Sequence, residues 1–201
     1  MPVDDSFLDA LRRPQPDPGG GSAAAHGALT AVCLLQKVAV LEKNRASEGS
    51  HHKRWWSAVL DQILALAEDF RRLRGEDAEA YRRLAEAIKT EKASKDQDEA
   101  AVDASRVPLT IMETSARALK TAHAVGERCA RRLWADVAVA AEFLGSAVQG
   151  AFWIGLANAE RIKDMHRRED LVQILCAQRA AGEDQLHLLR KALKGHIEAG
   201  R

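Results

Sequence analysis

A glycine-rich turn near the N-terminus has the residue types best suited to holding a ligand. Gly19, Gly20 and Gly21 follow a run of prolines, which cannot continue a helix, and Ser22 then opens an alanine-rich helical segment. Because glycine leaves backbone N–H groups uncovered and a helix N-terminus attracts anions, this turn suits an anionic ligand. Ser22 is expected to cap the helix through its hydroxyl group. The residues alone leave a second interpretation open, in which the turn is a flexible lead-in to the first long helix.

Two carboxylates stand where they could move a proton or stabilise a cation. Asp77 comes shortly after Gly75 and is expected either to occupy the first turn of a helix, where the dipole favours it, or to face a ligand. Asp136 comes at the head of a long segment, residues 137–156, that is too hydrophobic to face solvent. A carboxylate in that position is either a helix cap or a functional acid.

Neither the histidines nor the cysteines are spaced as metal ligands. His51 and His52 are adjacent, so on a helix they point about 100° apart, and no carboxylate is spaced to complete a site with them. Cys33, Cys129 and Cys176 stand alone, which is typical of reduced, buried thiols in a cytoplasmic protein. A nucleophilic role for one of them stays open, but we expect no metal site.

Composition narrows the classes of function. The chain has 201 residues, of which 46% are hydrophobic and 29% charged, as expected for one soluble domain over residues 1–201. The formal net charge of +1 gives no reason to expect nucleic acid or an anionic membrane as a partner. No apolar run approaches the roughly 20 residues that span a bilayer. Asp4 and Asp5 do not suit a secretory signal, so we expect a cytoplasmic location.

Apolar residues repeat at helical spacing along most of the chain, and no segment alternates as a strand would. Alanine is abundant and only 4% of residues are aromatic, which also favours helices. We expect an exposed connection or weak helix over residues 90–102, then a new helix with Pro108 as its first residue. The main helices are expected over residues 22–43, 56–75, 77–88, 108–133, 134–156 and 170–198. The sequence therefore predicts an all-α, multi-helix bundle of about six to eight helices.

Four stretches, taken in order, carry a further signal. They are Phe7-Leu8-Asp9-Ala10-Leu11 with Pro16 and Pro18-Gly19-Gly20-Gly21-Ser22-Ala23-Ala24-Ala25, then Asp77-Ala78-Glu79-Ala80-Tyr81, then Ala135-Asp136, then Gly150-Ala151 through Asn158 to Asp164. In this order they resemble the cyclodeaminase/cyclohydrolase family. That family includes the cyclodeaminase part of formiminotransferase-cyclodeaminase and stand-alone methenyltetrahydrofolate cyclohydrolases.

The resemblance implies an up-and-down bundle that forms a homodimer and acts on a folate or related pterin, with no metal or redox cofactor. Asp136 is the expected catalytic acid, with Asp77 second, and Asn158 would orient the pterin amide or an attacking water. The residues from Gly19 to Ser22 would supply backbone donors to the ligand. Arg45, or else Lys37 or Lys43, would pair with the acidic glutamate tail of the substrate.

This chain departs from the family pattern at several places. Ile154 replaces the first of two asparagines and cannot form a hydrogen bond, Ala135 replaces a serine, and the Lys-Lys-Tyr part of a basic segment near Arg45 is missing. These departures keep two alternatives open beside the enzyme. One is a catalytically degenerate folate-binding or assembly protein of the same fold, and the other is the same reaction on another pterin carrier.

Overall fold

The computed structural model describes residues 6–15, 17–90 and 94–198, and over these residues the chain is helical without a strand. The elements in order are α1 (Ser6–Leu11), α2 (Gly20–Arg45), α3 (His51–Lys89), α4 (Ser94–Arg128), the 3-10 turn η1 (Arg131–Leu133), α5 (Trp134–Ala159) and α6 (Met165–Glu198). The expected all-α class is therefore confirmed, at the lower end of the expected number of helices.

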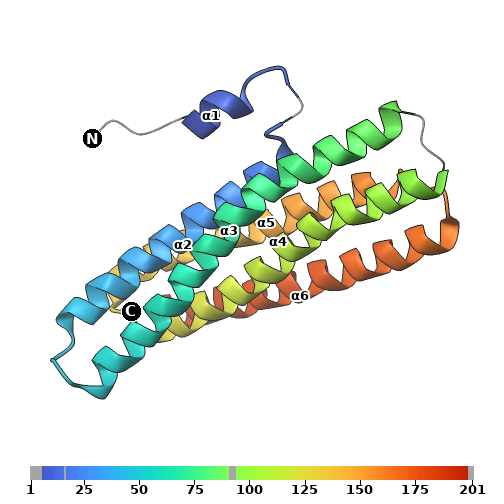
Figure 1. The fold of residues 1–201 in the computed structure, drawn as a ribbon. Helices are drawn as coiled ribbons and strands as arrows, with labels where there is room; N and C mark the ends of the chain where they lie inside the picture. The colour runs from blue at the N-terminus through green and yellow to red at the C-terminus, as the bar shows by residue number, and fades with distance from the viewer. Residues whose placement is uncertain (1–5, 16, 91–93, 199–201) are drawn as a thin grey trace.

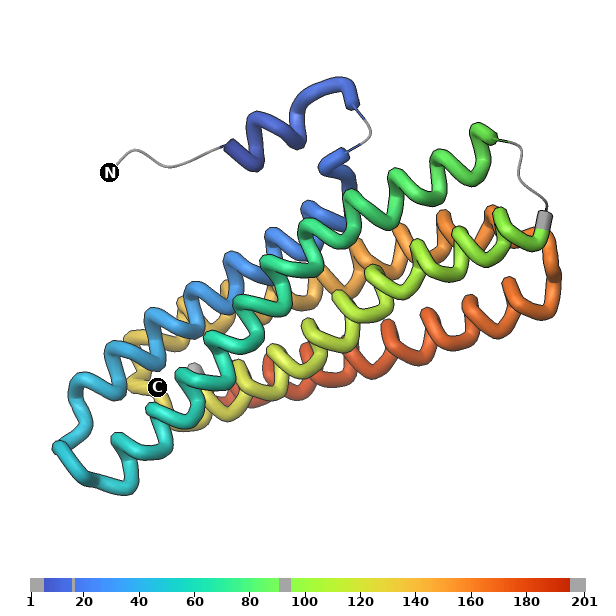
Figure 2. Tube along the Cα trace, viewed as in Figure 1, coloured from blue at the N-terminus to red at the C-terminus, as the bar shows by residue number. Residues whose placement is uncertain are grey.

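The five long helices, α2 to α6, lie along a common direction and alternate up and down, while α1 lies outside the bundle above α2 (Figures 1 and 2). The helix α5 packs against α2, α4 and α6, and α3 packs against α2 and α4. Because α2 and α5 are antiparallel neighbours, the start of α2 meets the end of α5. We call this the glycine end of the bundle, and the end where α2 stops and α5 starts the opposite end.

Two glycines of α5 let α6 approach it closely. A Cβ added at Gly145 would lie 2.5 Å from Leu186, and one added at Gly155 would lie 2.4 Å from Leu175. Both neighbours are leucine side chains of α6, so these two glycines serve helix packing rather than a ligand.

Two helices, α2 and the segment Arg131–Ala159, are long and apolar enough by length and composition to cross a bilayer. This corrects the expectation that no apolar stretch approaches that length, because isolated charged residues interrupt these stretches without ending them. Inside the bundle 44% and 50% of the two apolar windows are buried. An interior helix of a bundle is expected to have the same composition, so the absence of a membrane partner stays a prediction.

The boundaries differ from the sequence prediction around two helix-breaking residues. Gly75 does not end a helix, and α3 continues through it from His51 to Lys89 because buried residues on both sides keep packing on the same neighbours. Pro108 lies inside α4 rather than at its start. Asp77 is consequently in the body of a long helix and not in a first turn.

The predicted burial of the three cysteines is confirmed for one of them. Cys129 is buried, and burial, with the charge of Glu42 second, raises the pKa of its thiol to about 11. Cys33 and Cys176 are exposed, because each lies on the outer face of its helix, which corrects the expectation of three buried thiols.

Candidate functional site

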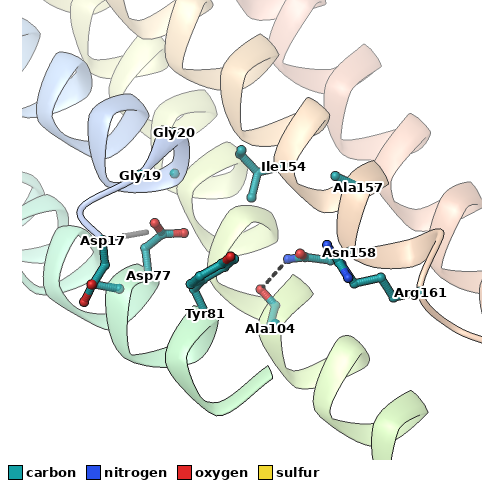
Figure 3. A pocket seen from close by; sticks show the side chains of 12 residues that line it. Asp17, Gly19, Gly20, Asp77, Tyr81, Ala104, Ile154, Ala157, Asn158 and Arg161 are labelled. Atoms are coloured by element: carbon teal, nitrogen blue, oxygen red, sulfur yellow. Dashed lines mark hydrogen bonds between the residues drawn. The ribbon is translucent and has the colours of Figure 1, made fainter. Parts of the chain in front are cut away.

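A cavity of about 220 Å³ opens at the glycine end, between the start of α2, the middle of α3 and the end of α5 (Figure 3). It brings together five of the residues predicted for the site, namely Gly19, Gly20, Gly21, Asp77 and Asn158. The other lining residues are Asp17, Ala78, Tyr81, Ala104, Ile154, Ala157 and Arg161.

The Asp77 carboxylate lies against the first turn of α2. Its Oδ2 accepts a hydrogen bond from the backbone N–H of Ser22 at 2.7 Å and lies 3.1 Å from the Ser22 hydroxyl. A Cβ added at Gly21 would lie 2.0 Å from Oδ1, so only glycine leaves room for this carboxylate. The helix N-terminus does bind an anion, as the glycines suggested, but the anion is a side chain of the same protein.

This arrangement corrects the role expected for Ser22. The N-cap position of α2 is held by Gly19, without a side-chain cap, and Ser22 lies inside the helix and is buried. Its hydroxyl donates to the backbone oxygen of Arg74 at 2.9 Å instead of accepting from a backbone N–H in the first turn of α2. Ser22 therefore joins α2 to α3 by hydrogen bonds and orients the Asp77 carboxylate.

The surroundings of Asp77 act on its protonation in two directions. The Ser22 hydroxyl lies within donating distance of two acceptors, the backbone oxygen of Arg74 at 2.9 Å and Oδ2 of Asp77 at 3.1 Å, and its single proton is shared between them. Burial raises the pKa of Asp77, and the hydrogen bonds from the Ser22 hydroxyl and N–H lower it by less. A raised pKa brings a carboxyl group nearer to the range in which general acids and bases work.

Asn158 and Ala104 line the opposite side of the cavity, and Pro108 acts on both from inside α4. Proline has no N–H, so the backbone oxygen of Ala104, four residues earlier, loses its usual helical partner. The Asn158 side-chain amide donates to that oxygen at 3.1 Å, the dashed line in Figure 3. The proline inside α4 therefore creates the acceptor that fixes the orientation of Asn158.

Tyr81 and Arg161 line the cavity, but the sequence analysis gave neither of them a role in the site, although both lie in stretches that carry the family resemblance. Tyr81 follows Asp77 by one helical turn, and Arg161 follows Asn158 by nearly one turn, so each shares a face with a residue that was predicted. That spacing is the signal that would have found them. Ile154 lies on the inner wall, where a Cβ added at Gly20 would come within 2.9 Å of it.

The segment before α2 packs against α2 and α3 through Phe7 and Asp17. Phe7 stacks on His26 with ring centroids 4.3 Å apart, and the Arg74 guanidinium lies 5.1 Å from the Phe7 centroid and 3.1 Å from Nδ1 of His26. Burial, and then the charge of Arg74, lower the pKa of His26. Asp17, which lines the cavity, pairs with Arg82 at 3.0 Å. These contacts hold the glycine turn in place.

The structure does not bring Asp136 to this cavity within one chain. Asp136 lies at the opposite end of α5 from Asn158, roughly 33 Å away at about 1.5 Å of rise per residue. Its carboxylate pairs with Lys37 at 2.9 Å, so Lys37 already has an anionic partner. Arg45 is also at the opposite end and pairs with the buried Glu42 at 3.4 Å.

In the part of the chain that the structure describes, no three histidine, cysteine, aspartate or glutamate side chains gather as metal ligands would. The cavity itself offers a carboxyl group, an amide and backbone groups. Such a set is suited to proton transfer and to recognition of a polar ring, whether or not a metal takes part.

A family model described as formiminotransferase-cyclodeaminase matches residues 4–175, which include every residue that lines the cavity. The chain belongs to this family. The resemblance seen in the sequence is thereby confirmed.

Among solved structures, the formiminotetrahydrofolate cyclodeaminase of Thermotoga maritima superposes with a TM-score of 0.86, at 21% sequence identity. The superposition covers 98% of this chain and 98% of that chain. At this identity the likeness shows that the two proteins share the all-helical cyclodeaminase fold. A comparison with curated protein sequences gave no match.

Proposed function

We propose that this protein acts on the one-carbon unit between N5 and N10 of tetrahydrofolate, as a formiminotetrahydrofolate cyclodeaminase or a methenyltetrahydrofolate cyclohydrolase. The observation that carries the proposal is the Asp77 carboxyl group, held at the glycine turn by Ser22 and lining one cavity with Asn158. Membership of the family over residues 4–175 supports the substrate class.

Both reactions need a group that moves protons beside a delocalised cation. In the cyclohydrolase reaction, water adds to the cationic methenyl carbon, the bond from that carbon to N5 breaks and the 10-formyl product forms. In the cyclodeaminase reaction, N10 attacks the 5-formimino carbon and ammonia leaves. Asp77 would take the proton of the attacking water or N10 and return it to the leaving nitrogen. Its ionised form would stabilise the cation.

Asn158 would orient the substrate from the other wall. One N–H of its amide is already directed at Ala104, which leaves the amide oxygen to accept a hydrogen bond from the pterin amide or the attacking water. Ile154 adds an apolar contact where the family pattern has an amide. The proposal requires no metal and no redox cofactor.

We further propose that the active form is a homodimer joined through α5. Val139, Phe143 and Trp153 form a stripe on α5 that stays 47%, 42% and 64% exposed. Their spacing matches an antiparallel pairing of two α5 helices. In such a pairing centred between Val139 and Trp153, the partner's Asp136 would lie beside Leu156, which adjoins Ala157 of the cavity lining. Asp136 would then act as a catalytic acid in the site of the partner chain.

A spectrophotometric assay tests the proposed function. Purified protein is mixed with methenyltetrahydrofolate near neutral pH, and the loss of its ultraviolet absorbance is compared with the spontaneous rate. In a parallel assay, 5-formiminotetrahydrofolate is supplied and the release of ammonia is measured. We expect acceleration of one reaction and a loss of about 100-fold or more in Asp77→Asn. Asp61→Asn, an exposed aspartate of α3, is the matched control.

The alternatives give other results in the same assays. Folate binding without acceleration of either reaction would identify a degenerate folate-binding protein, as the Ile154 and Ala135 departures suggest. Acceleration with another reduced pterin, and none with tetrahydrofolate derivatives, would identify a different carrier. Full activity in Asp77→Asn would contradict the role given to this carboxyl group.

A further inference from the structure

A second hollow continues outward from the cavity of the proposed active site. It is lined by Tyr81, Leu84, Ala85, Ile88, Lys89 and Arg161, and it shares Tyr81 and Arg161 with that cavity. Figure 3 shows these two shared side chains beside Asp77 and Asn158. Together the two hollows form one groove that follows the last three turns of α3, and we call it the α3 groove.

The floor of the α3 groove is a single face of one helix. Asp77, Tyr81, Ala85 and Ile88 follow one another at intervals of three or four residues, so they line up over about 16 Å of helix axis. Tyr81 and Ile88 are 42% and 39% exposed, unlike the other large apolar residues of this part of α3, which are buried. The groove therefore begins with the Asp77 carboxyl group and continues with the partly exposed side chains of Tyr81 and Ile88.

The outer part of the α3 groove is cationic. Arg161 and Lys89 line it, and no ion pair joins either of them to a carboxylate of the described residues. The neighbouring arginines of α3 differ, because Arg82 pairs with Asp17 and Glu79. The two cations at the groove are thus available to an anion brought by a ligand.

We propose that the α3 groove binds the aminobenzoyl-glutamate part of a reduced folate, with the ring against Tyr81 and Ile88 and the glutamate carboxylates at Arg161 and Lys89. This inference rests on the proposed function, which puts the pterin ring beside Asp77. It assigns the tail to the glycine end of the chain that holds the pterin, whereas Arg45, Lys37 and Lys43 lie toward the opposite end. Arg161 and Lys89 then determine specificity for the glutamate without taking part in the chemistry.

Binding of two stable analogues tests this assignment. The probes are 5-formyltetrahydrofolate and 5-formyltetrahydropteroate, which lacks only the glutamate, and the dissociation constants are measured by titration calorimetry. We expect the wild-type protein to prefer the folate. Arg161→Gln and Lys89→Gln should each weaken folate binding roughly tenfold, because a charge-assisted contact is lost, and leave pteroate binding unchanged. Unchanged pteroate binding also shows that the variants are folded.

Other outcomes separate this inference from the proposed function. Arg71→Gln, an exposed arginine of α3 outside the groove, is the matched control and should bind both probes as the wild type does. If the wild type binds both probes equally, or if Arg45→Gln rather than Arg161→Gln loses folate affinity, the tail assignment is overturned while the proposed function stands. If the wild type binds neither probe, the proposed function fails together with the tail assignment.

Discussion

The two carboxylates that the sequence singled out, Asp77 and Asp136, have very different surroundings in the fold. Asp77 is held by the backbone and hydroxyl of Ser22 and lines a cavity with Asn158. Asp136 is in the first turn of α5, paired with Lys37 on the surface of the opposite end. The sequence analysis ranked them the other way, with Asp136 as the expected catalytic acid and Asp77 second, because a long apolar segment follows Asp136.

The difference shows that the local pattern around an acid does not decide its role. What distinguishes Asp77 is a partner 55 residues away, the start of α2, which meets it only because α2 and α3 pack side by side. Burial without a cation then raises the pKa of Asp77. Asp136 has a cation beside it and acts as a first-turn acid, which the helix dipole favours. Of these two carboxylates, Asp77 is the one that lines a cavity and has a raised pKa within one chain.

The largest expected effect comes from closing the space for Asp77. In Gly21→Ala the new methyl group would occupy the place of the carboxylate, so Asp77 must leave Ser22. We expect at least about a 100-fold loss of kcat together with a lower Tm. Gly27→Ala, in the same helix but with nothing within 4 Å of the added carbon, should keep full activity. A fully active Gly21→Ala variant would show that the contact with Ser22 has no role.

Mixing two inactive variants tests whether Asp136 joins the site from a second chain. If each site uses Asp77 of one chain and the partner's Asp136, a dimer of Asp77→Asn with Asp136→Asn contains one intact site. Random mixing after unfolding and refolding should then restore up to about one quarter of the wild-type activity. Sedimentation analysis confirms that mixed dimers form. Mixed dimers without activity would leave Asp136 as a surface partner of Lys37.

The parts of the site that could be read from the sequence are those whose residue types are locally unusual. Three glycines before an alanine-rich helix stand out without knowledge of the fold, whereas Asn158 was predicted only through the resemblance to the family. The use of Ser22 was not predictable in the same way, because a serine at a helix start most often caps that helix. Its partners, Arg74 and Asp77, come from another helix and become known only when α2 and α3 are packed.

The role of Pro108 illustrates the same limit for the fold. A proline is expected at a helix start, but α4 continues through it, because the helix is buried on both sides of that residue. The carbonyl that it leaves without a helical partner is then taken by Asn158 from α5. Residue spacing predicted helices on either side of Pro108. The contact between Asn158 and the backbone oxygen of Ala104 becomes known only when α5 is packed against α4.

The pH dependence of stability distinguishes Asp77 from an ordinary surface carboxylate. The pKa of Asp77 is raised above its ordinary value of 3.8, so the folded chain holds the proton over a pH interval in which the unfolded chain has lost it. The free energy of unfolding therefore decreases as pH rises through that interval. Asp77→Asn cannot ionise, and its free energy of unfolding should increase relative to the wild type as pH rises from about 3.8. Urea unfolding across this range measures the difference, with Asp61→Asn as reference, and a constant difference for Asp77→Asn would contradict the burial of its charge.

The smallest expected effect concerns the wall opposite Asp77. Pro108→Ala supplies the missing N–H, which would donate to the backbone oxygen of Ala104 and compete with the Asn158 amide. We expect a higher Tm, because proline is unfavourable inside a helix, and roughly threefold weaker binding of 5-formyltetrahydrofolate, the effect of about 0.7 kcal/mol. Since Pro108 acts through Asn158, adding Asn158→Ala to Pro108→Ala should weaken binding no further than Asn158→Ala alone. Independent, additive losses would show that the proline affects the cavity by another route.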